Sequence, residues 1–414
     1  MPERLICFFR CSADVDHISP IIYQWAQVEG NPVSVVVISS VELFKTDYRI
    51  QFLRTYNNIE IFHLLQFIPE RLRGINGNPN QLAIDGDPAL EKDWIQNILA
   101  SLHKPGEQRV VAFAFPDDQF ARALCSEAKG EGIPCAFLPH SGSTFSKDVH
   151  KVDINEINLD PPDPYSHSSD IDEFATLLVW NSLLRARLKE GYLESGFVKI
   201  LGSARYCKEW RPLLRELQTK YVTRQQDETY KIVFFLRGQA HTIWWEELAR
   251  VVAIIAQLDN VTLVIQHHPR DEDYTLVDRL IATYPFLKEH LENKVEIAPR
   301  EISAGALVDW SDAVLDLASS PSLEAILDNK PLLELEYLHG YRSIVCDYLP
   351  ECEVRYRDEF ITKLKNIYHN PDHPFYDEER RAEFLKLEVG DPTQNTLKRY
   401  TNALRSMLSN SSTP

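Results

Sequence analysis

Two polar segments of the sequence carry side chains suited to binding an anion. The first is Gln266–Arg270 (QHHPR), which follows the apolar run VTLVI. Pro269 would end a strand at this point, and His268 and Arg270 would then offer hydrogen-bond donors to a phosphate or a nucleobase. The alternative interpretation is a polar strand end with two incidental histidines.

The second segment is Ala318–Ala325 (ASSPSLEA), which follows the apolar run AVLDL. A helix that begins near Pro321 would direct its positive end, its first backbone N–H groups and nearby hydroxyls toward one phosphate. Glu324, one turn into the helix, would complete the cap or accept a hydrogen bond from a ribose. An ordinary helix cap is the alternative. The serines concerned are Ser319, Ser320 and Ser322.

Both segments follow predicted strands in the second half of the chain. There, short apolar runs such as Lys231–Leu236 (KIVFFL) alternate six times with helical segments, which predicts a doubly wound α/β domain. The runs are continuously apolar rather than alternating, so we predict parallel strands covered on both faces. Ligands of such sheets bind at the carboxyl ends of the strands. Arg237 and Gln239, just after KIVFFL, are therefore further candidates for the same pocket.

The first half of the chain repeats the strand–helix–strand pattern with less distinctive polar residues. His140 follows the apolar run PCAFL, and a neutral histidine is a suitable general base near pH 7. Asp117 and Asp118 follow RVVAFAF and are alternative bases, or a helix cap. Asp14 and His17 are predicted to lie in a loop after the first strand, Leu5–Phe9, where they could contact an acceptor.

Taken together, the His-Pro and Ser-Ser segments resemble bacterial GT-B glycosyltransferases of capsule and lipopolysaccharide synthesis, which carry HP and SS motifs. These include transferases that use CMP-Kdo or CMP-sialic acid, and relatives of the CDP-glycerol polymerases. The resemblance implies that His268, Ser319 and Ser320 contact the phosphate and ribose of a nucleotide, with Pro269 shaping the loop. The match covers about residues 174–345.

Two further segments are similar to these families, each with a departure. Asn181–Arg205 resembles the run that precedes their second domain, although Ala204 stands where many members have proline. The loop around His140 resembles the His-Gly loop of the CDP-glycerol polymerases, which implies a base that deprotonates the acceptor hydroxyl. Here Ser141 separates His140 from Gly142.

The resemblance implies an α/β, GT-B fold of two facing Rossmann-like domains with mainly parallel sheets and an interdomain cleft. We predict an acceptor-binding domain over residues 1–205 and a donor-binding domain over residues 206–390. Residues 391–414 would form a C-terminal helix that crosses back to the first domain, followed by a disordered tail.

The predicted function is transfer of a sugar from a nucleotide donor, with CMP-sugars favoured, to a surface-polysaccharide or glycolipid acceptor. No cofactor or metal is predicted, and inversion or retention stays open. The first alternative is a sugar-nucleotide enzyme similar to the UDP-GlcNAc 2-epimerases, which would turn over without an acceptor. The second is a non-catalytic partner in glycan assembly.

Composition and charge argue against several other classes of function and location. The formal net charge of -17 argues against a nucleic-acid partner, since phosphate binding needs clustered lysine and arginine. The seven cysteines form no CxxC pair, which favours a reducing compartment over a zinc site. Met1–Arg10 is too short and charged for a signal peptide, and no apolar run approaches about 20 residues. We therefore predict a cytoplasmic protein with at most peripheral membrane contact.

Overall fold

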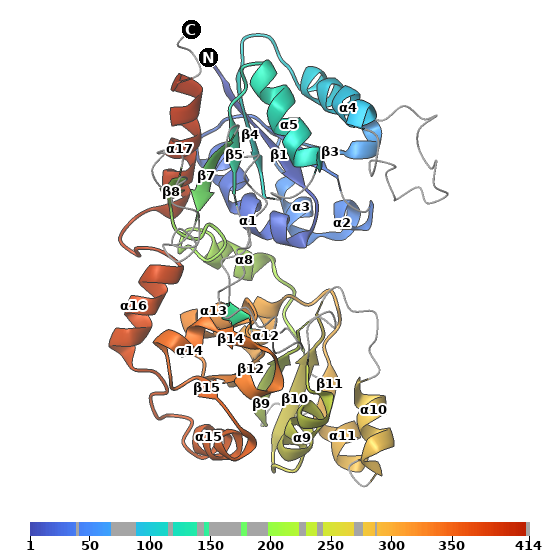
Figure 1. The fold of residues 1–414 in the computed structure, drawn as a ribbon, viewed down its shortest axis with the longest axis vertical. Helices are drawn as coiled ribbons and strands as arrows, with labels where there is room; N and C mark the ends of the chain where they lie inside the picture. Colours follow the sequence, from blue (N-terminus) through green and yellow to red (C-terminus); the bar gives the residue numbers. More distant parts are fainter. Residues whose placement is uncertain are drawn as a thin grey trace, which may run out of the picture. The chain divides into compact units, whose positions relative to one another are not determined.

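The structure, a computed structural model, divides the chain into two compact units. Unit 1 comprises Met1–Gly142, Asp163–Leu217 and Lys386–Pro414, and unit 2 comprises Ser143–Pro162 and Gln218–Leu385 (Figure 1). The structure describes residues 1–38, 41–67, 88–114, 119–138, 145–148, 175–179, 198–222, 229–237, 243–268, 276–285 and 288–410.

Unit 1 is built on a parallel sheet whose described strands run in the order β3-β2-β1-β4-β5-β7-β8. The strands are β1 (Glu3–Phe9), β2 (Val33–Val37), β3 (Ile59–His63), β4 (Gln108–Phe113), β5 (Cys135–Phe137), β7 (Ala175–Val179) and β8 (Val198–Ile200). The α-helices are α1 (Ser12–Tyr23), α2 (Val41–Thr46), α3 (Tyr48–Leu53), α4 (Pro88–Ser101), α5 (Gln119–Gly130), α8 (Arg211–Leu217) and α17 (Thr396–Asn410).

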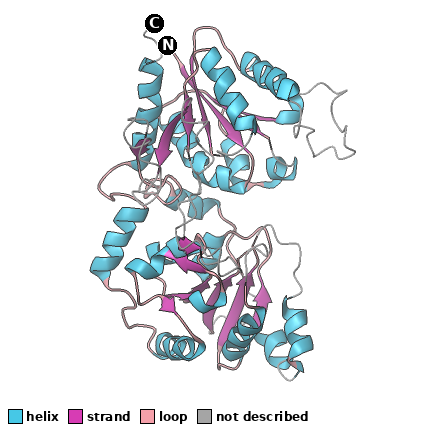
Figure 2. Ribbon diagram, viewed as in Figure 1, coloured by secondary structure: helices cyan, strands magenta, loops and turns pink. Residues whose placement is uncertain are grey.

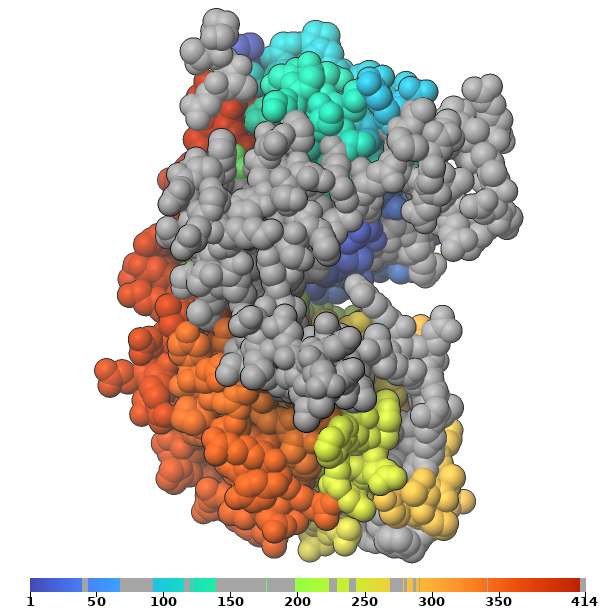
Figure 3. Space-filling view, viewed as in Figure 1, coloured from blue at the N-terminus to red at the C-terminus, as the bar shows by residue number. Residues whose placement is uncertain are grey.

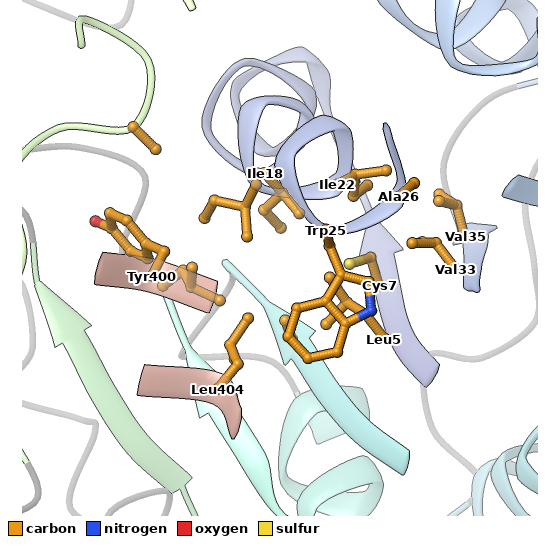
Figure 4. Close-up of a cluster of buried hydrophobic side chains, with 14 of the residues drawn as sticks. Leu5, Cys7, Ile18, Ile22, Trp25, Ala26, Val33, Val35, Tyr400 and Leu404 are labelled. Atoms are coloured by element: carbon orange, nitrogen blue, oxygen red, sulfur yellow. The ribbon is translucent and has the colours of Figure 1, made fainter. Parts of the chain in front are cut away.

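Helices cover both faces of this sheet. Neighbouring residues of a strand point to opposite faces, so a continuous apolar strand buries side chains against helices on both. Leu5 and Cys7 of β1 pack with Trp25 and with Tyr400 of α17 (Figure 4). Phe8, the next residue after Cys7, points to the other side and contacts the ring of Phe120 in α5, with ring centroids 5.9 Å apart. The continuous apolar run of β1 is therefore buried on both sides, as the sequence predicts for a parallel sheet.

Unit 2 repeats the architecture with a parallel sheet whose described strands run β11-β10-β9-β12-β13-β15. The strands are β9 (Tyr230–Phe235), β10 (Val261–Gln266), β11 (Val295–Ile297), β12 (Ala313–Asp316), β13 (Leu332–Leu335) and β15 (Glu353–Val354). A separate antiparallel pair joins β6 (Phe145–Asp148) to β14 (Tyr341–Ser343).

The helices of this second part are α9 (Trp245–Ala256), α10 (Leu276–Thr283), α11 (Lys288–Lys294), α12 (Ala304–Trp310), α13 (Pro321–Leu327), α14 (Ile344–Tyr348), α15 (Arg357–His369) and α16 (Glu378–Glu388). Strands and helices alternate through both units (Figure 2), so the predicted α/β class with parallel sheets is confirmed. On the face drawn in Figure 3, much of the described surface of unit 2 comes from residues beyond 300, in orange to red.

Candidate functional site

The carboxyl ends of β10, β9 and β12 lie at one edge of the unit 2 sheet, since these strands are parallel neighbours. The polar segments singled out in the sequence follow these ends directly. His267 and His268 come after β10, Arg237 after β9, and Ser319 after β12. The two predicted anion-binding segments therefore start from the same sheet edge, separated by the single strand β9.

Arg237 links β9 to the turn that follows β12. Its side chain is buried, and its Nη1 atom lies 3.3 Å from the carbonyl oxygens of both Leu317 and Ala318. By donating to these carbonyl oxygens, the guanidinium group holds the backbone of the β12–α13 turn. In this structure Arg237 therefore stabilises the backbone of the candidate site.

The β12–α13 turn has an unusual backbone and a dense set of hydrogen bonds. Ala318 has φ of +53°, a left-handed conformation that is uncommon for a residue with a side chain. Its N–H donates to Oε2 of Glu334 at 2.9 Å, and the N–H of Ser319 donates to Oδ2 of Asp316 at 2.7 Å. These two carboxyl groups hold the strained turn in place.

The serine hydroxyls of the turn contact the same two carboxyl groups. Ser319 Oγ lies 2.5 Å from Oδ1 of Asp316, and Ser322 Oγ lies 2.6 Å from Oε1 of Glu334 while also hydrogen-bonding Asp316. Asp316 and Glu334 are fully buried and are direct neighbours in the β12–β13 register. Side chains at paired positions share one face of a sheet, which explains their convergence on Ser322.

This arrangement differs from the anion site expected at the start of α13. The N–H of Ser322 donates to the carbonyl of Ser319 at 3.3 Å, and that of Leu323 donates to Ser320 at 3.2 Å. Ser322 is also buried, with its hydroxyl turned toward the carboxyl groups. Two of the N–H groups predicted to face a phosphate are therefore engaged by carbonyl oxygens of the turn, and the hydroxyls of Ser319 and Ser322 are engaged by Asp316 and Glu334.

The pKa values around this turn are raised rather than lowered. Burial raises the pKa of Glu334 well above its usual value, and the nearby Asp316 raises it further. Burial also raises the pKa of Asp316. Glu336, at the end of β13, is largely buried, which raises its pKa to about 7. The sequence analysis did not single out Asp316, Glu334 or Glu336. What could have indicated them is the presence of acidic residues within or directly after the apolar runs AVLDL and PLLEL.

Glu324 lies in α13 and is largely buried. A side chain added at Gly305 would place its Cβ 2.6 Å from Oε2 of Glu324, so α12 approaches this carboxyl closely. A larger residue at position 305 would therefore push the end of the Glu324 side chain aside.

After β10, the structure buries His267 and leaves His268 half-exposed, so His268 is the histidine of the pair better placed to reach a ligand. Gln266 anchors the strand end by donating to the carbonyl of Ile302 at 2.7 Å. The predicted site residues Pro269, Arg270 and Gln239 lie outside the described residues.

In unit 1 the predicted loop placement of Asp14 and His17 is wrong. Both belong to α1, which begins at Ser12, and both are buried. Asp14 accepts the N–H groups of Arg10 at 2.7 Å and Cys11 at 3.1 Å, which starts the helix earlier than its polar sequence suggests.

The ring of His17 packs edge to face on that of Tyr400 in α17, with centroids 6.3 Å apart. Neither Asp14 nor His17 is exposed to an acceptor in this structure. The predicted bases Asp117, Asp118 and His140 lie outside the described residues.

Comparison with known proteins gives no match to any protein-family model and none to a curated protein. Solved structures do match along nearly the whole chain. UDP-GlcNAc 2-epimerase from Neisseria meningitidis bound to UDP-GlcNAc has a TM-score of 0.59 at 11% identity, covering 97% of this chain and 100% of its own. The enzyme from Methanocaldococcus jannaschii has a TM-score of 0.57 at 12% identity, covering 98% and 100%.

A third match is the UDP co-structure of S. aureus MnaA, with a TM-score of 0.59 at 13% identity, covering 98% of this chain and 97% of its own. Likeness at such low identity shows a shared fold. The fold class is therefore the GT-B-like arrangement of two Rossmann-type domains, as predicted from the sequence.

The interpretation as a CMP-sugar glycosyltransferase is wrong. The full-length structural matches favour the sugar-nucleotide epimerases, and none of the three described above is a CMP-sugar transferase. The error has a physical cause. The two motifs mark polar residues at the carboxyl ends of strands, and that position binds ligands throughout this type of fold whatever the reaction.

Proposed function

We propose that the protein is an enzyme that binds a uridine diphosphate sugar and changes its configuration at C2, in the manner of UDP-GlcNAc 2-epimerases. The observation that carries this proposal is the full-length likeness of the fold to such enzymes, including a structure with UDP-GlcNAc and another with UDP. The polar carboxyl edge of the unit 2 sheet supports it, because nucleotides bind at that position in doubly wound folds.

In this proposal the nucleotide lies over the ends of β10 and β12. His268 would donate a hydrogen bond to the diphosphate, and Ser320 would contact the phosphate or ribose from the β12–α13 turn. Ser319, whose N–H and hydroxyl donate to Asp316, would contact the ribose by accepting a hydrogen bond through Oγ. Arg237 would act through the turn whose carbonyl oxygens it contacts, because its buried positive charge favours an anion bound at that turn. A local cationic group matters here because the chain as a whole carries a formal charge of -17.

The reaction is tested with UDP-GlcNAc in deuterated water. Inversion at C2 through removal and return of the C2 proton would introduce solvent deuterium at that carbon, and proton NMR detects both the exchange and the C2 epimer. No acceptor is added, so turnover distinguishes the epimerase from a transferase. If calorimetry detects neither UDP nor UDP-GlcNAc binding, the proposal fails.

The role of His268 is tested by His268→Ala, which should weaken UDP binding roughly tenfold through loss of one charge-assisted hydrogen bond. Glu289→Gln on the exposed surface of α11 is the control and should bind UDP as the unaltered protein does. Equal affinity of His268→Ala and the control would remove His268 from the site.

A non-catalytic nucleotide-sugar-binding protein is the second candidate. It rests on the same polar carboxyl edge of the unit 2 sheet, which can bind a nucleotide with or without catalysis. It predicts measurable UDP-GlcNAc binding by calorimetry with no deuterium at C2, so the same pair of experiments separates the two candidates.

A further inference from the structure

Asp316 and Glu334 form a buried acidic pair without a basic partner in the described part of the chain. Their contacts there are with serine hydroxyls and backbone N–H groups. The other titratable groups that face Glu334 are Glu336, at the end of its own strand, and a set from neighbouring segments: Cys346 of α14, Cys352 before β15, and Tyr376. None of these groups is a cation. The buried guanidinium of Arg237 lies at the same turn, but the hydrogen bonds described for it go to the carbonyl oxygens of Leu317 and Ala318. Two full negative charges on Asp316 and Glu334 would therefore repel each other in a dry environment.

The number of hydrogens available at Ser322 also indicates that Asp316 and Glu334 are not both ionised. Its hydroxyl carries one hydrogen, yet its oxygen lies within hydrogen-bonding distance of carboxyl oxygens from both Asp316 and Glu334. Two acceptors cannot both be satisfied by one hydrogen. One of the two carboxyl groups must supply the second hydrogen by being protonated.

The remaining contacts decide which carboxyl group holds the proton. Asp316 accepts the N–H of Ser319 and its hydroxyl as well as contacting Ser322, so three donors stabilise its negative charge. Glu334 accepts one backbone N–H, from Ala318, through Oε2. Within the described part of the chain, its Oε1 faces the hydroxyl of Ser322 alone. The carboxylate with more donors keeps the charge.

We propose that Glu334 is a neutral carboxylic acid that donates to Ser322 and accepts from Ala318, and that it thereby positions the β12–α13 turn for nucleotide binding. The resulting chain runs Glu334 to Ser322 to Asp316, each group donating to the next. It fixes Ala318 in its left-handed conformation and orients Ser319. The positioning role rests on the nucleotide site proposed above, whereas the protonation does not.

Protonation is tested directly by infrared spectroscopy of the full chain at pH 7. Glu336, whose pKa is raised to about 7, would give its own band at pH 7, so the spectra are compared in a Glu336→Gln background. There, a carbonyl band of a protonated carboxyl group should be present, should be lost when Glu334→Gln is added, and should persist when the control Glu289→Gln is added. Absence of the band, or its persistence with Glu334→Gln, would show that Glu334 does not hold the proton. This readout is independent of any ligand.

Positioning is tested by calorimetry with UDP. Glu334→Gln reproduces both contacts of the neutral acid, because its amide can donate to Ser322 and accept from Ala318; it should bind UDP within about twofold of the unaltered chain. Glu334→Leu removes both contacts and should bind roughly tenfold more weakly. Circular dichroism confirms that both variants are folded, and if Glu334→Leu is not, Ser322→Ala supplies the same test by removing the bridging hydroxyl.

The pH profile separates positioning from a merely structural role. As the pH is raised above 7 and Glu334 loses its proton, the UDP affinity of the unaltered chain should fall relative to that of Glu334→Gln, which cannot lose this proton. Parallel profiles, or equal affinity of Glu334→Leu and Glu334→Gln, would overturn the positioning role. If the unaltered chain binds no UDP while the infrared band is present, the proposed function fails, the turn has no nucleotide to be positioned for, and the protonation of Glu334 stands.

Discussion

Acidic side chains are buried in both units, against arginines in unit 1 and against serine hydroxyls in unit 2. In unit 1, Asp16 contacts Arg49 and lies 3.3 Å from Arg205, while Asp47 lies 2.5 Å from Arg49. In unit 2, Asp316 and Glu334 converge on a single serine. Burial alone therefore does not determine how an acidic group behaves in this molecule; its partners do.

The two clusters titrate in opposite directions. Burial opposes ionisation of Asp16, but Arg205 and Arg49 outweigh it and lower the pKa of Asp16. The stability that this contributes is present above the ordinary pKa of aspartate and is lost as pH falls. Burial and Asp316 raise the pKa of Glu334, so its contribution is present below the ordinary pKa of glutamate and is lost as pH rises.

The largest expected effect comes from removing the shared arginine of unit 1. Arg49→Met leaves Asp47 largely buried without its guanidinium partner and should lower the free energy of unfolding by about 3 kcal/mol in urea denaturation. Arg54→Met, at an exposed position of the next turn, is the matched control and should change it by less than about 0.5 kcal/mol. Similar values for the two variants would mean that arginine does not neutralise the unit 1 cluster.

Removing the acid of unit 2 should cost less, because no full charge is left newly unpaired. Glu334→Leu deprives the N–H of Ala318 and the hydroxyl of Ser322 of a partner, and we expect a loss of about 2 kcal/mol in the same denaturation experiment. Glu334→Gln keeps both contacts and should stay within about 0.5 kcal/mol of the unaltered chain at pH 7. A loss of 2 kcal/mol or so in both variants would indicate that the ionised form is the stabilising one.

The sequence was sufficient to predict the parallel sheets, but it was insufficient to predict the two acidic clusters. The run AVLDL predicted a strand over 313–317, and β12 occupies Ala313–Asp316, because continuous apolar runs report burial on both faces. That Asp316 pairs with Glu334 depends on the register of β12 against β13, which is a long-range property. Local patterns carry no information about such a pairing.

The predicted site shows the same limit. Arg237 and His268 were selected because ligands of a doubly wound sheet bind at the strand ends. The structure places both residues after strands of the unit 2 sheet, and their binding roles stay predictions. Asp14 was misplaced because the polar sequence RCSADVDH resembles a loop, although its carboxylate caps α1. The donor class was wrong because short motifs report a binding position and not the chemistry performed there.

A smaller effect should appear when the pH is raised. Above about pH 5, the free energy of unfolding of the unaltered chain should fall relative to that of Glu334→Gln as the pH rises, by up to about 1.4 kcal/mol per pH unit, because the folded state keeps a proton that the unfolded state has already lost. Urea denaturation of both proteins at several pH values measures the difference. If the unaltered chain instead gains stability relative to Glu334→Gln as the pH rises, the sign assigned to the unit 2 cluster is wrong.

Asp14 offers a third kind of environment and the smallest expected effect. It is fully buried like Asp316, but its carboxylate accepts two backbone N–H groups at the start of α1. Asp14→Asn keeps an oxygen acceptor for these groups and removes the negative charge, which interacts favourably with the helix dipole. We expect a decrease of about 0.5 kcal/mol in the free energy of unfolding. Asp93→Asn, exposed within α4, is the control and should show no change. If Asp14→Asn instead lowers the free energy of unfolding as much as Arg49→Met does, the negative charge of Asp14 stabilises the fold as much as the arginine-paired carboxylates of unit 1. Backbone N–H groups would then stabilise a buried carboxylate as well as guanidinium groups do in this fold.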